Sequence, residues 1–156
     1  MTGRVDAINT SRGGVPKHGV FEAFVTGHGL DGDHQGDTRF HGGPDRAVVL
    51  YSLDVIQALV REGHPIAAGA TGENVTIAGL DWARLAPGTV LRVGGAQLEI
   101  VTYVTPCTTI ARSFLNGEFQ RIEQRLHPGW SRVAARVLAE GLVRVGDAVS
   151  DCQPLV

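Results

Sequence analysis

The chain has 156 residues, 43% of them apolar and 19% charged, which is an ordinary composition for one globular domain. A net charge of −2 offers no basic surface for nucleic acid or for an anionic membrane, so neither is an expected partner. Because the sequence has no run of roughly 18 apolar residues and no N-terminal signal pattern, it predicts a soluble, cytoplasmic protein.

Strands and glycine-rich loops are expected to alternate in the first half of the chain. Residues 4–8 and 20–25 are predicted as strands from their β-branched and aromatic content, and the turn-forming cluster between them predicts a hairpin or a bent pair. A short buried strand is predicted at 46–51. Ser52 is the expected N-cap of a helix at 53–62, whose apolar residues fall on one face.

The second half continues with strands and one short helix. A glycine-broken loop at 69–74 leads into a predicted strand at 75–77. Strands at 90–93 and 97–102 are predicted to pair as a hairpin, because a Gly-Gly link joins two alternating segments. A short helix is expected at 110–115.

Residues 130–138 are compatible with two structures. Their apolar residues follow the spacing of an amphipathic helix, so the pattern alone favours a helix. Residues 138–149, however, look like a hairpin that turns near Glu140, with a second turn near Gly146. A helix would therefore have to stop abruptly at Glu140.

The stretch at 27–51 is rich in glycine, aspartate and histidine, a composition more typical of a site loop than of a scaffold. Its aspartates begin like an EF-hand loop, but the twelfth position is Gly42 instead of glutamate, so a calcium site is not expected. These aspartates are more simply explained by hydrogen bonds to loop amides. A zinc site is a weaker alternative, because no recognised zinc spacing relates the three histidines, which are His28, His34 and His41.

Five short motifs together carry a resemblance to a known family. In chain order they are GLDGDHQGDTRFHGGPDRAVVLYS, TGEN, a hairpin that ends in TPC, HPGW, and a terminal V-x-x-GD. From about Gly3 to Val149 the chain resembles the MOSC domain, which is found at the C-terminus of molybdenum cofactor sulfurases, in the mitochondrial amidoxime-reducing component and as stand-alone bacterial proteins. The resemblance implies a mainly β (α+β) fold, a β-barrel with a few short peripheral helices, and a strand at 130–138.

No repeat or linker divides the sequence. We therefore expect residues 1–150 to form a single domain and residues 151–156 to form a C-terminal tail. A barrel with exposed strand edges is also compatible with a homodimer.

Cys107 is the candidate for metal binding and catalysis. It follows a proline, has the hydroxyl groups of Thr105 and Thr109 nearby in sequence, and is expected at the start of a helix, where the thiolate is favoured. A lone intracellular cysteine is otherwise most often a small buried apolar residue. The resemblance implies the functional role, since the family's cysteine is regarded as the ligand of molybdenum or the carrier of a persulfide. Cys152, near the end of the chain, is expected to be a reduced thiol without such a role.

The family's cofactor, the molybdenum cofactor (molybdopterin), is an anionic pterin. Its phosphate requires arginine side chains, backbone amides, or both. Each candidate contact also has a simpler explanation, as a solvated charge or a turn cap, and just before the cysteine the chain lacks an arginine that some relatives carry. The candidate cofactor contacts are Lys17, Arg39, His41, Arg46, Asn74 and Thr105.

Two functions from different classes follow. In the first, the protein is a molybdenum-dependent oxidoreductase that reduces a small N-hydroxylated base or an amidoxime. Electrons then come from a separate redox partner, because two cysteines cannot ligate a four-cysteine iron–sulfur cluster. In the second, the protein is a non-catalytic carrier, in which Cys107 holds sulfur as a persulfide or holds the cofactor for delivery.

Overall fold

β-Strands are the main regular secondary structure of the computed structural model, which describes residues 1–33 and 43–152. The strands are β1 (Thr2–Thr10), β2 (His18–Val20), β3 (Glu22–Thr26), β4 (Gly29–Leu30), β5 (Val48–Ser52), β6 (Val75–Ala78), β7 (Val90–Val93), β8 (Ala96–Tyr103), β9 (Val133–Ala139), β10 (Gly141–Arg144) and β11 (Ala148–Asp151). The helices are α1 (Leu53–Arg61) and the short 3-10 helices η1 (Pro44–Arg46), η2 (Trp82–Arg84), η3 (Thr108–Ser113), η4 (Leu115–Gly117) and η5 (Phe119–Ile122). The expected mainly β fold with a few short helices is confirmed.

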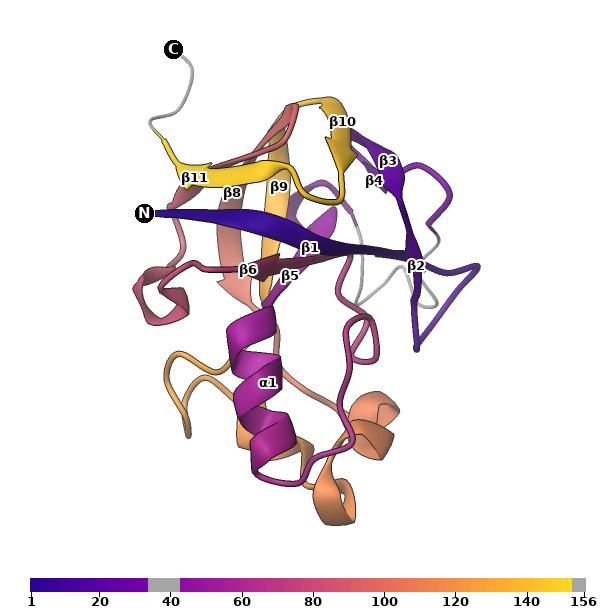
Figure 1. The fold of residues 1–156 in the computed structure, drawn as a ribbon, viewed down its shortest axis with the longest axis vertical. Helices are drawn as coiled ribbons and strands as arrows, with labels where there is room; N and C mark the ends of the chain where they lie inside the picture. The colour runs from indigo at the N-terminus through magenta and orange to yellow at the C-terminus, as the bar shows by residue number, and fades with distance from the viewer. Residues whose placement is uncertain (34–42, 153–156) are drawn as a thin grey trace.

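Seven of the described strands close into a barrel (Figure 1). Their order is β11-β7-β8-β9-β5-β6-β1, and β1 pairs again with β11, so that Thr2 lies opposite Ser150. The neighbours β5 and β6 run parallel, whereas β1 runs antiparallel to both β6 and β11. The expected MOSC-type barrel is therefore present.

Aliphatic side chains fill the barrel. Leu50, Ile77 and Ile100 come from three different strands, and each is 0% exposed. The interior of a small barrel is just wide enough for its own side chains. A ligand site in this protein therefore has to form outside the barrel, from the segments that connect its strands.

Helix α1 makes the crossover that two parallel strands require. It begins as predicted, since Ser52 Oγ accepts a hydrogen bond from the Val55 N–H at 3.1 Å, and Glu62 is its C-cap. Ile56 and Leu59 are buried on the face of the helix that contacts β5 and β6. The chain then returns to β6 through a loop at 69–74 that borders the site.

The expected continuous strand at 20–25 is wrong. The chain bends at Phe21, whose side chain is 68% exposed, and the two halves take different partners. β2 pairs with β1, whereas β3 pairs with β10 and β4. The bend thus transfers the chain from β2, which extends the barrel sheet beside β1, to a separate three-stranded sheet.

The expected hairpin at 138–149 is also wrong. β9, β10 and β11 follow one another with turns at the predicted places, but β9 pairs with β5 and β8, β10 with β3, and β11 with β1 and β7. Tertiary packing gives each of these strands partners that are far away in sequence, in the barrel for β9 and β11 and in the three-stranded sheet for β10. Succession along the chain therefore does not decide the pairing.

The strand implied at 130–138 is confirmed, although β9 itself covers Val133–Ala139. Three consecutive residues, Val133, Ala134 and Ala135, are buried. Alternation identifies a strand only when one face is exposed, so a strand that begins with a buried run loses that signal and can match helical spacing by chance. The strand predicted at 46–51 also starts later than expected, at Val48, because η1 occupies Pro44–Arg46.

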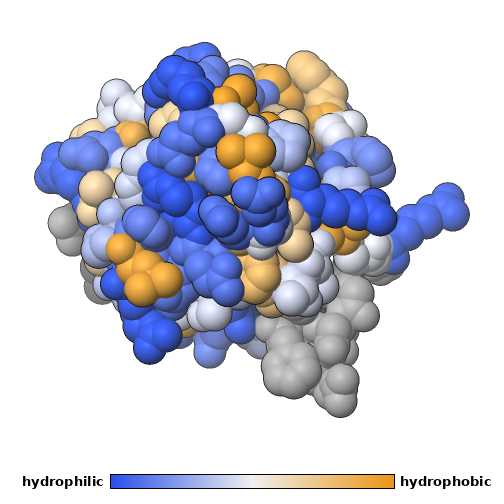
Figure 2. All heavy atoms as spheres, turned by 90° about the horizontal axis from the view of Figure 1, so that it is seen from below, coloured by the Kyte–Doolittle hydropathy of each residue, from blue (hydrophilic) through white to orange (hydrophobic). Residues whose placement is uncertain are grey.

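Figure 2 shows the lower end of the molecule as drawn in Figure 1, where α1 and the orange 3-10 helices η3 to η5 lie. This face is mainly hydrophilic, and its hydrophobic residues are scattered. Within residues 1–33 and 43–152, no helix has the length and apolar character needed to cross a membrane.

Candidate functional site

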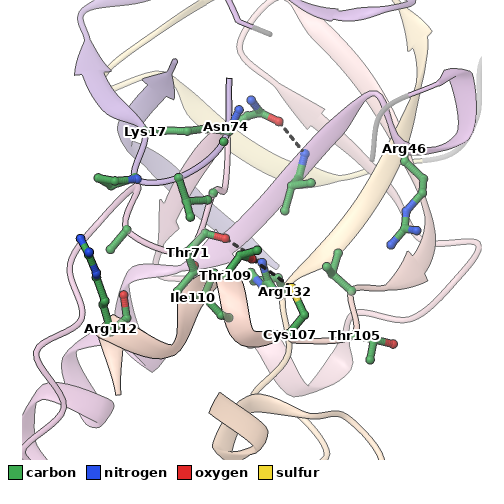
Figure 3. Close-up of a pocket in the computed structure, with 18 of the residues that line it drawn as sticks. Lys17, Arg46, Thr71, Asn74, Thr105, Cys107, Thr109, Ile110, Arg112 and Arg132 are labelled. Carbon is green, nitrogen blue, oxygen red and sulfur yellow. Dashed lines mark hydrogen bonds between the residues drawn. The ribbon is translucent and has the colours of Figure 1, made fainter. Parts of the chain in front are cut away.

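A cavity of about 870 Å3 lies against the ends of the barrel strands. Its walls come mainly from residues 14–17, the start of β5, the loop at 70–74 and the segment at 104–113 (Figure 3). Ligand sites typically have volumes of roughly 300–1,000 Å3. Segments that are far apart in sequence thus enclose a space of the size that a cofactor needs.

Cys107 lies in the wall of this cavity and is partly buried. Its Sγ is 2.9 Å from the hydroxyl oxygen of Thr109. Cys107 is the N-cap of η3, a six-residue 3-10 helix, so the short helix that the sequence predicts at 110–115 begins two residues earlier, at Thr108. A helix dipole makes little contribution at so short an element, so neighbouring side chains decide the charge around the sulfur.

Arg132 is a neighbour that the sequence prediction missed. It immediately precedes β9, lines the same cavity and is only 7% exposed. Its Nη1 donates to the Thr71 carbonyl oxygen at 2.6 Å, whereas its buried Nε–H has no acceptor among the described residues. Burial lowers the pKa of Arg132, and the nearby acidic groups Tyr51, Glu73 and Cys107 oppose that shift.

Glu73 holds the loop that binds Arg132. It is fully buried, and its carboxylate accepts hydrogen bonds from the Gly69 N–H at 3.0 Å, the Thr71 hydroxyl at 3.0 Å and the Thr76 hydroxyl at 3.2 Å. Burial raises the pKa of Glu73 despite these bonds. The glutamate of the TGEN motif therefore positions Thr71, whose carbonyl in turn positions the guanidinium of Arg132.

Lys17, Asp33 and Asn74 form a second buried cluster beside the cavity. The Lys17 ammonium lies 2.6 and 2.7 Å from the two carboxylate oxygens of Asp33, and the Asn74 amide donates to the same carboxylate at 2.9 Å. Asn74 Oδ1 also accepts from the Val49 N–H at 2.8 Å. The hydrogen-bonding groups of Lys17 and Asn74 are thus engaged with protein.

The structure brings five of the predicted site residues together at the cavity. Arg39 and His41, the other two, lie outside the described residues, as do His34 and most of the segment that suggested calcium or zinc. Arg112 also lines the cavity but had no sequence signal beyond its charge. The five residues at the cavity are Lys17, Arg46, Asn74, Thr105 and Cys107.

Comparison with known proteins places this geometry in a family. The family model for the MOSC domain matches residues 37–150. The uncharacterized protein YflK of Bacillus subtilis is 33% identical over 121 residues, which is 75% of this chain and 52% of the relative. Protein YiiM of Escherichia coli is 30% identical over 138 residues, which is 83% of this chain and 62% of the relative. The chain therefore spans between half and two thirds of the length of these two relatives.

The solved structures agree with the sequence relatives. The crystal structure of YiiM from Escherichia coli has a TM-score of 0.75 and 25% sequence identity, covering 99% of this chain and 71% of that one. The family match includes Cys107, Arg132 and the loop that contains Glu73. From the family match and the shared barrel, the chain belongs to the MOSC domain family.

Proposed function

We propose that the cavity binds the molybdenum cofactor in the cytoplasm, with Cys107 as the protein ligand of the metal, and that the protein reduces N-hydroxylated bases or amidoximes. The observation that carries this proposal is a partly buried thiol in the wall of a cavity that also holds several cationic side chains. Thiolates bind soft metals, and cations bind the phosphate of an anionic pterin. The cationic residues at the cavity are Lys17, Arg46, Arg112 and Arg132.

The described residues fit an anionic cofactor. Arg132 has a buried N–H without an acceptor in the described part of the chain, and the exposed Arg112 adds charge at the cavity. Arg46 lies near enough to Arg132 to lower the pKa of that group further, after the larger effect of burial. Guanidinium groups bind phosphate and other oxyanions through paired N–H donors. We therefore assign phosphate binding to Arg46 and Arg112, while Lys17 keeps its hydrogen bonds to Asp33.

Reduction of an N-hydroxylated base to the amine consumes two electrons and two protons and releases the oxygen as water. Bound molybdenum would supply the redox chemistry of this step. Cys107 would hold the metal, and the Thr109 hydroxyl, 2.9 Å from Sγ, would fix the orientation of the sulfur. We assign the supply of electrons to a separate redox protein, because this chain has two cysteines and cannot ligate a four-cysteine cluster.

Cofactor content is the first test. The protein is expressed in a host that makes molybdenum cofactor, and bound molybdenum is measured together with the fluorescent oxidation product of the pterin. We expect both in the wild type, loss of molybdenum in Cys107→Ser, and retention in Cys152→Ser, a matched control whose thiol lies by Gln97 and outside the cavity wall. Absence of molybdenum and pterin from the wild type would contradict the proposal.

Turnover is the second test, because a bound cofactor alone does not distinguish an enzyme from a carrier. The loaded protein is assayed with 6-N-hydroxylaminopurine and an artificial reductant. Formation of adenine that depends on Cys107 supports the reductase. Cofactor that is retained, transferred to an acceptor protein and never turned over supports the carrier instead.

A further inference from the structure

Arg132 is a buried cation whose surroundings leave it incompletely satisfied. Glu73 lies close enough to raise the pKa of Arg132. The Glu73 carboxylate, however, accepts a hydrogen bond from the Thr71 hydroxyl, and the Arg132 guanidinium donates to the Thr71 backbone carbonyl. Its Nε–H has no acceptor in the described part of the chain. Buried polar groups without partners are uncommon because they are costly, and those that persist commonly have a functional explanation.

The incompletely satisfied guanidinium group belongs to the same cavity wall as the thiol. Arg132, Cys107 and Thr109 all line the cavity, and Figure 3 shows their side chains gathered beside Thr71. The charge of Cys107 raises the pKa of Arg132, as expected for two groups in the same wall. A ligand that contacts the sulfur would therefore also be within the field of the guanidinium.

We propose that Arg132 is an oxyanion-binding residue, whose guanidinium group binds an oxygen of the anionic group held beside the Cys107 sulfur. The ligand class is a small tetrahedral oxyanion or the oxyanionic part of a larger cofactor. This assignment rests on the proposed function only for the identity of that cofactor. The subsite itself is built from the cavity, the thiol and the incompletely satisfied guanidinium group of Arg132.

The guanidinium is held ready for such a ligand. Its Nη1 is fixed by the Thr71 carbonyl at 2.6 Å, and Thr71 is fixed by the buried carboxylate of Glu73. The backbone of Arg132 is fixed as well, since its carbonyl accepts from the Val104 N–H at 3.0 Å. A donor that is already ordered loses little conformational entropy on binding.

Protection of the thiol tests the subsite without any cofactor. The chain is produced in a host that cannot make molybdenum cofactor, on a Cys152→Ser background, and the rate of Cys107 alkylation by iodoacetamide is measured against increasing sodium molybdate or sodium phosphate. We expect molybdate to slow alkylation saturably. Arg132→Gln should raise the half-protecting concentration by about tenfold or more, the loss expected for a hydrogen bond between charged groups.

Arg136→Gln is the matched control, because Arg136 lies four residues further along the chain, within β9, but is exposed and bound to Glu99 at 2.9 Å. It should leave protection unchanged. Arg132→Lys retains the charge and loses the planar guanidinium group, and it decides the question if Arg132→Gln does not fold, as judged by thermal melting. Protection of this variant should weaken several-fold.

The outcomes separate this assignment from the proposed function. Protection by molybdate alone supports a site selective for the metal oxyanion, and equal protection by phosphate supports a general oxyanion site. No protection of the wild type by either anion, or unchanged protection in Arg132→Lys, overturns the assignment. Because the assay contains no cofactor, a wild type that binds no molybdenum cofactor would sink the proposed function and leave this result standing.

Discussion

Two buried polar clusters border the cavity, and they differ in how completely they are satisfied. We refer to Lys17, Asp33 and Asn74 as the Asp33 cluster and to Arg132, Thr71 and Glu73 as the Arg132 cluster. In the Asp33 cluster, one carboxylate accepts from an ammonium, from an amide and, at 2.9 Å, from the Ser11 N–H. In the Arg132 cluster, by contrast, a buried donor lacks an acceptor among the described residues.

Whether a buried group has all of its hydrogen-bond partners therefore distinguishes a structural role from a ligand-binding role better than its charge does. A fully satisfied buried network makes the local structure rigid, and its groups are not available without disruption. An incompletely satisfied group retains a donor for a ligand. Lys17 and Arg132 are both cations at the same cavity, yet the first is expected to support the fold and the second to bind.

Removing the acceptor of the Asp33 cluster should have the largest effect. Asp33→Leu leaves the buried Lys17 without its carboxylate, and breaking a buried pair in this way typically costs about 3–5 kcal/mol of the free energy of unfolding. Urea denaturation followed by circular dichroism measures the loss. A loss below about 1 kcal/mol would mean that the cluster is solvated and not structural.

The double variant Lys17→Met/Asp33→Leu is the control for that experiment. It removes both charges and places two apolar side chains of related size in the same space. Replacement of a buried pair by apolar residues is often close to neutral. We therefore expect the double variant to recover at least half of the stability that Asp33→Leu loses.

Glu73→Gln should have the next largest effect, because an amide N–H2 group then faces donors that previously met a carboxylate oxygen. We expect a loss of about 1–3 kcal/mol in the free energy of unfolding.

Burial raises the pKa of Glu73 above its unfolded value of 4.5, so the folded state binds the proton more tightly. Its contribution to stability is therefore fully present below that value and declines as pH rises through the raised pKa.

A pH series of urea denaturation checks this sign. The advantage of the wild type over Glu73→Gln should shrink as the pH is raised above about 4.5, the unfolded value. A difference that stays constant with pH would show that Glu73 titrates alike in both states.

Arg132→Met should destabilise the protein much less than Asp33→Leu does. The variant loses one hydrogen bond to the Thr71 carbonyl but also removes a buried charge with an unsatisfied N–H, so we expect a net loss of about 1 kcal/mol. The same urea denaturation measures it. A loss as large as that of Asp33→Leu would remove the contrast between the two clusters.

An exposed ion pair should give the smallest effect. Arg121 binds Glu62 through Nε at 2.9 Å and Nη2 at 2.8 Å, but the Glu62 side chain is 40% exposed. Glu62→Gln should therefore cost about 0.5 kcal/mol and less in high salt. The hydrogen bond from Arg121 lowers the pKa of Glu62, so its contribution is present above the unfolded value of 4.5 and is lost as pH falls, opposite to Glu73.

Much of the fold could be predicted from local signals. The Ser52 cap, the crossover helix and the Gly-Gly hairpin are each specified by neighbouring residues. What could not be predicted is which strands pair at long range, because β9, β10 and β11 are adjacent in sequence and yet pair elsewhere. The strand at β9 was predicted through the family resemblance, since its buried start hides the alternation.

The sequence predicted which kinds of residue form the candidate site. It did not predict which of them are bound by other protein groups and which remain available to a ligand. Cys107 and several cations do meet at one cavity, as the motifs suggested. Sequence could not show that Asp33 holds Lys17, because the two are brought together by tertiary packing. Arg132 did carry a weak signal, as the one charged residue among neighbours that lead into a buried strand.

The seam between β1 and β11 has a consequence for how the barrel forms. Thr2 and Ser150 are separated by almost the whole chain, so the closing contacts have a very high contact order and form slowly. β11 is also the last of these strands to be synthesised. Until it emerges, β1 and β7 each keep an open edge, and open edges pair readily with other chains. The yield of folded protein should therefore depend on how many unfinished barrels meet during synthesis, and should rise when expression is slowed.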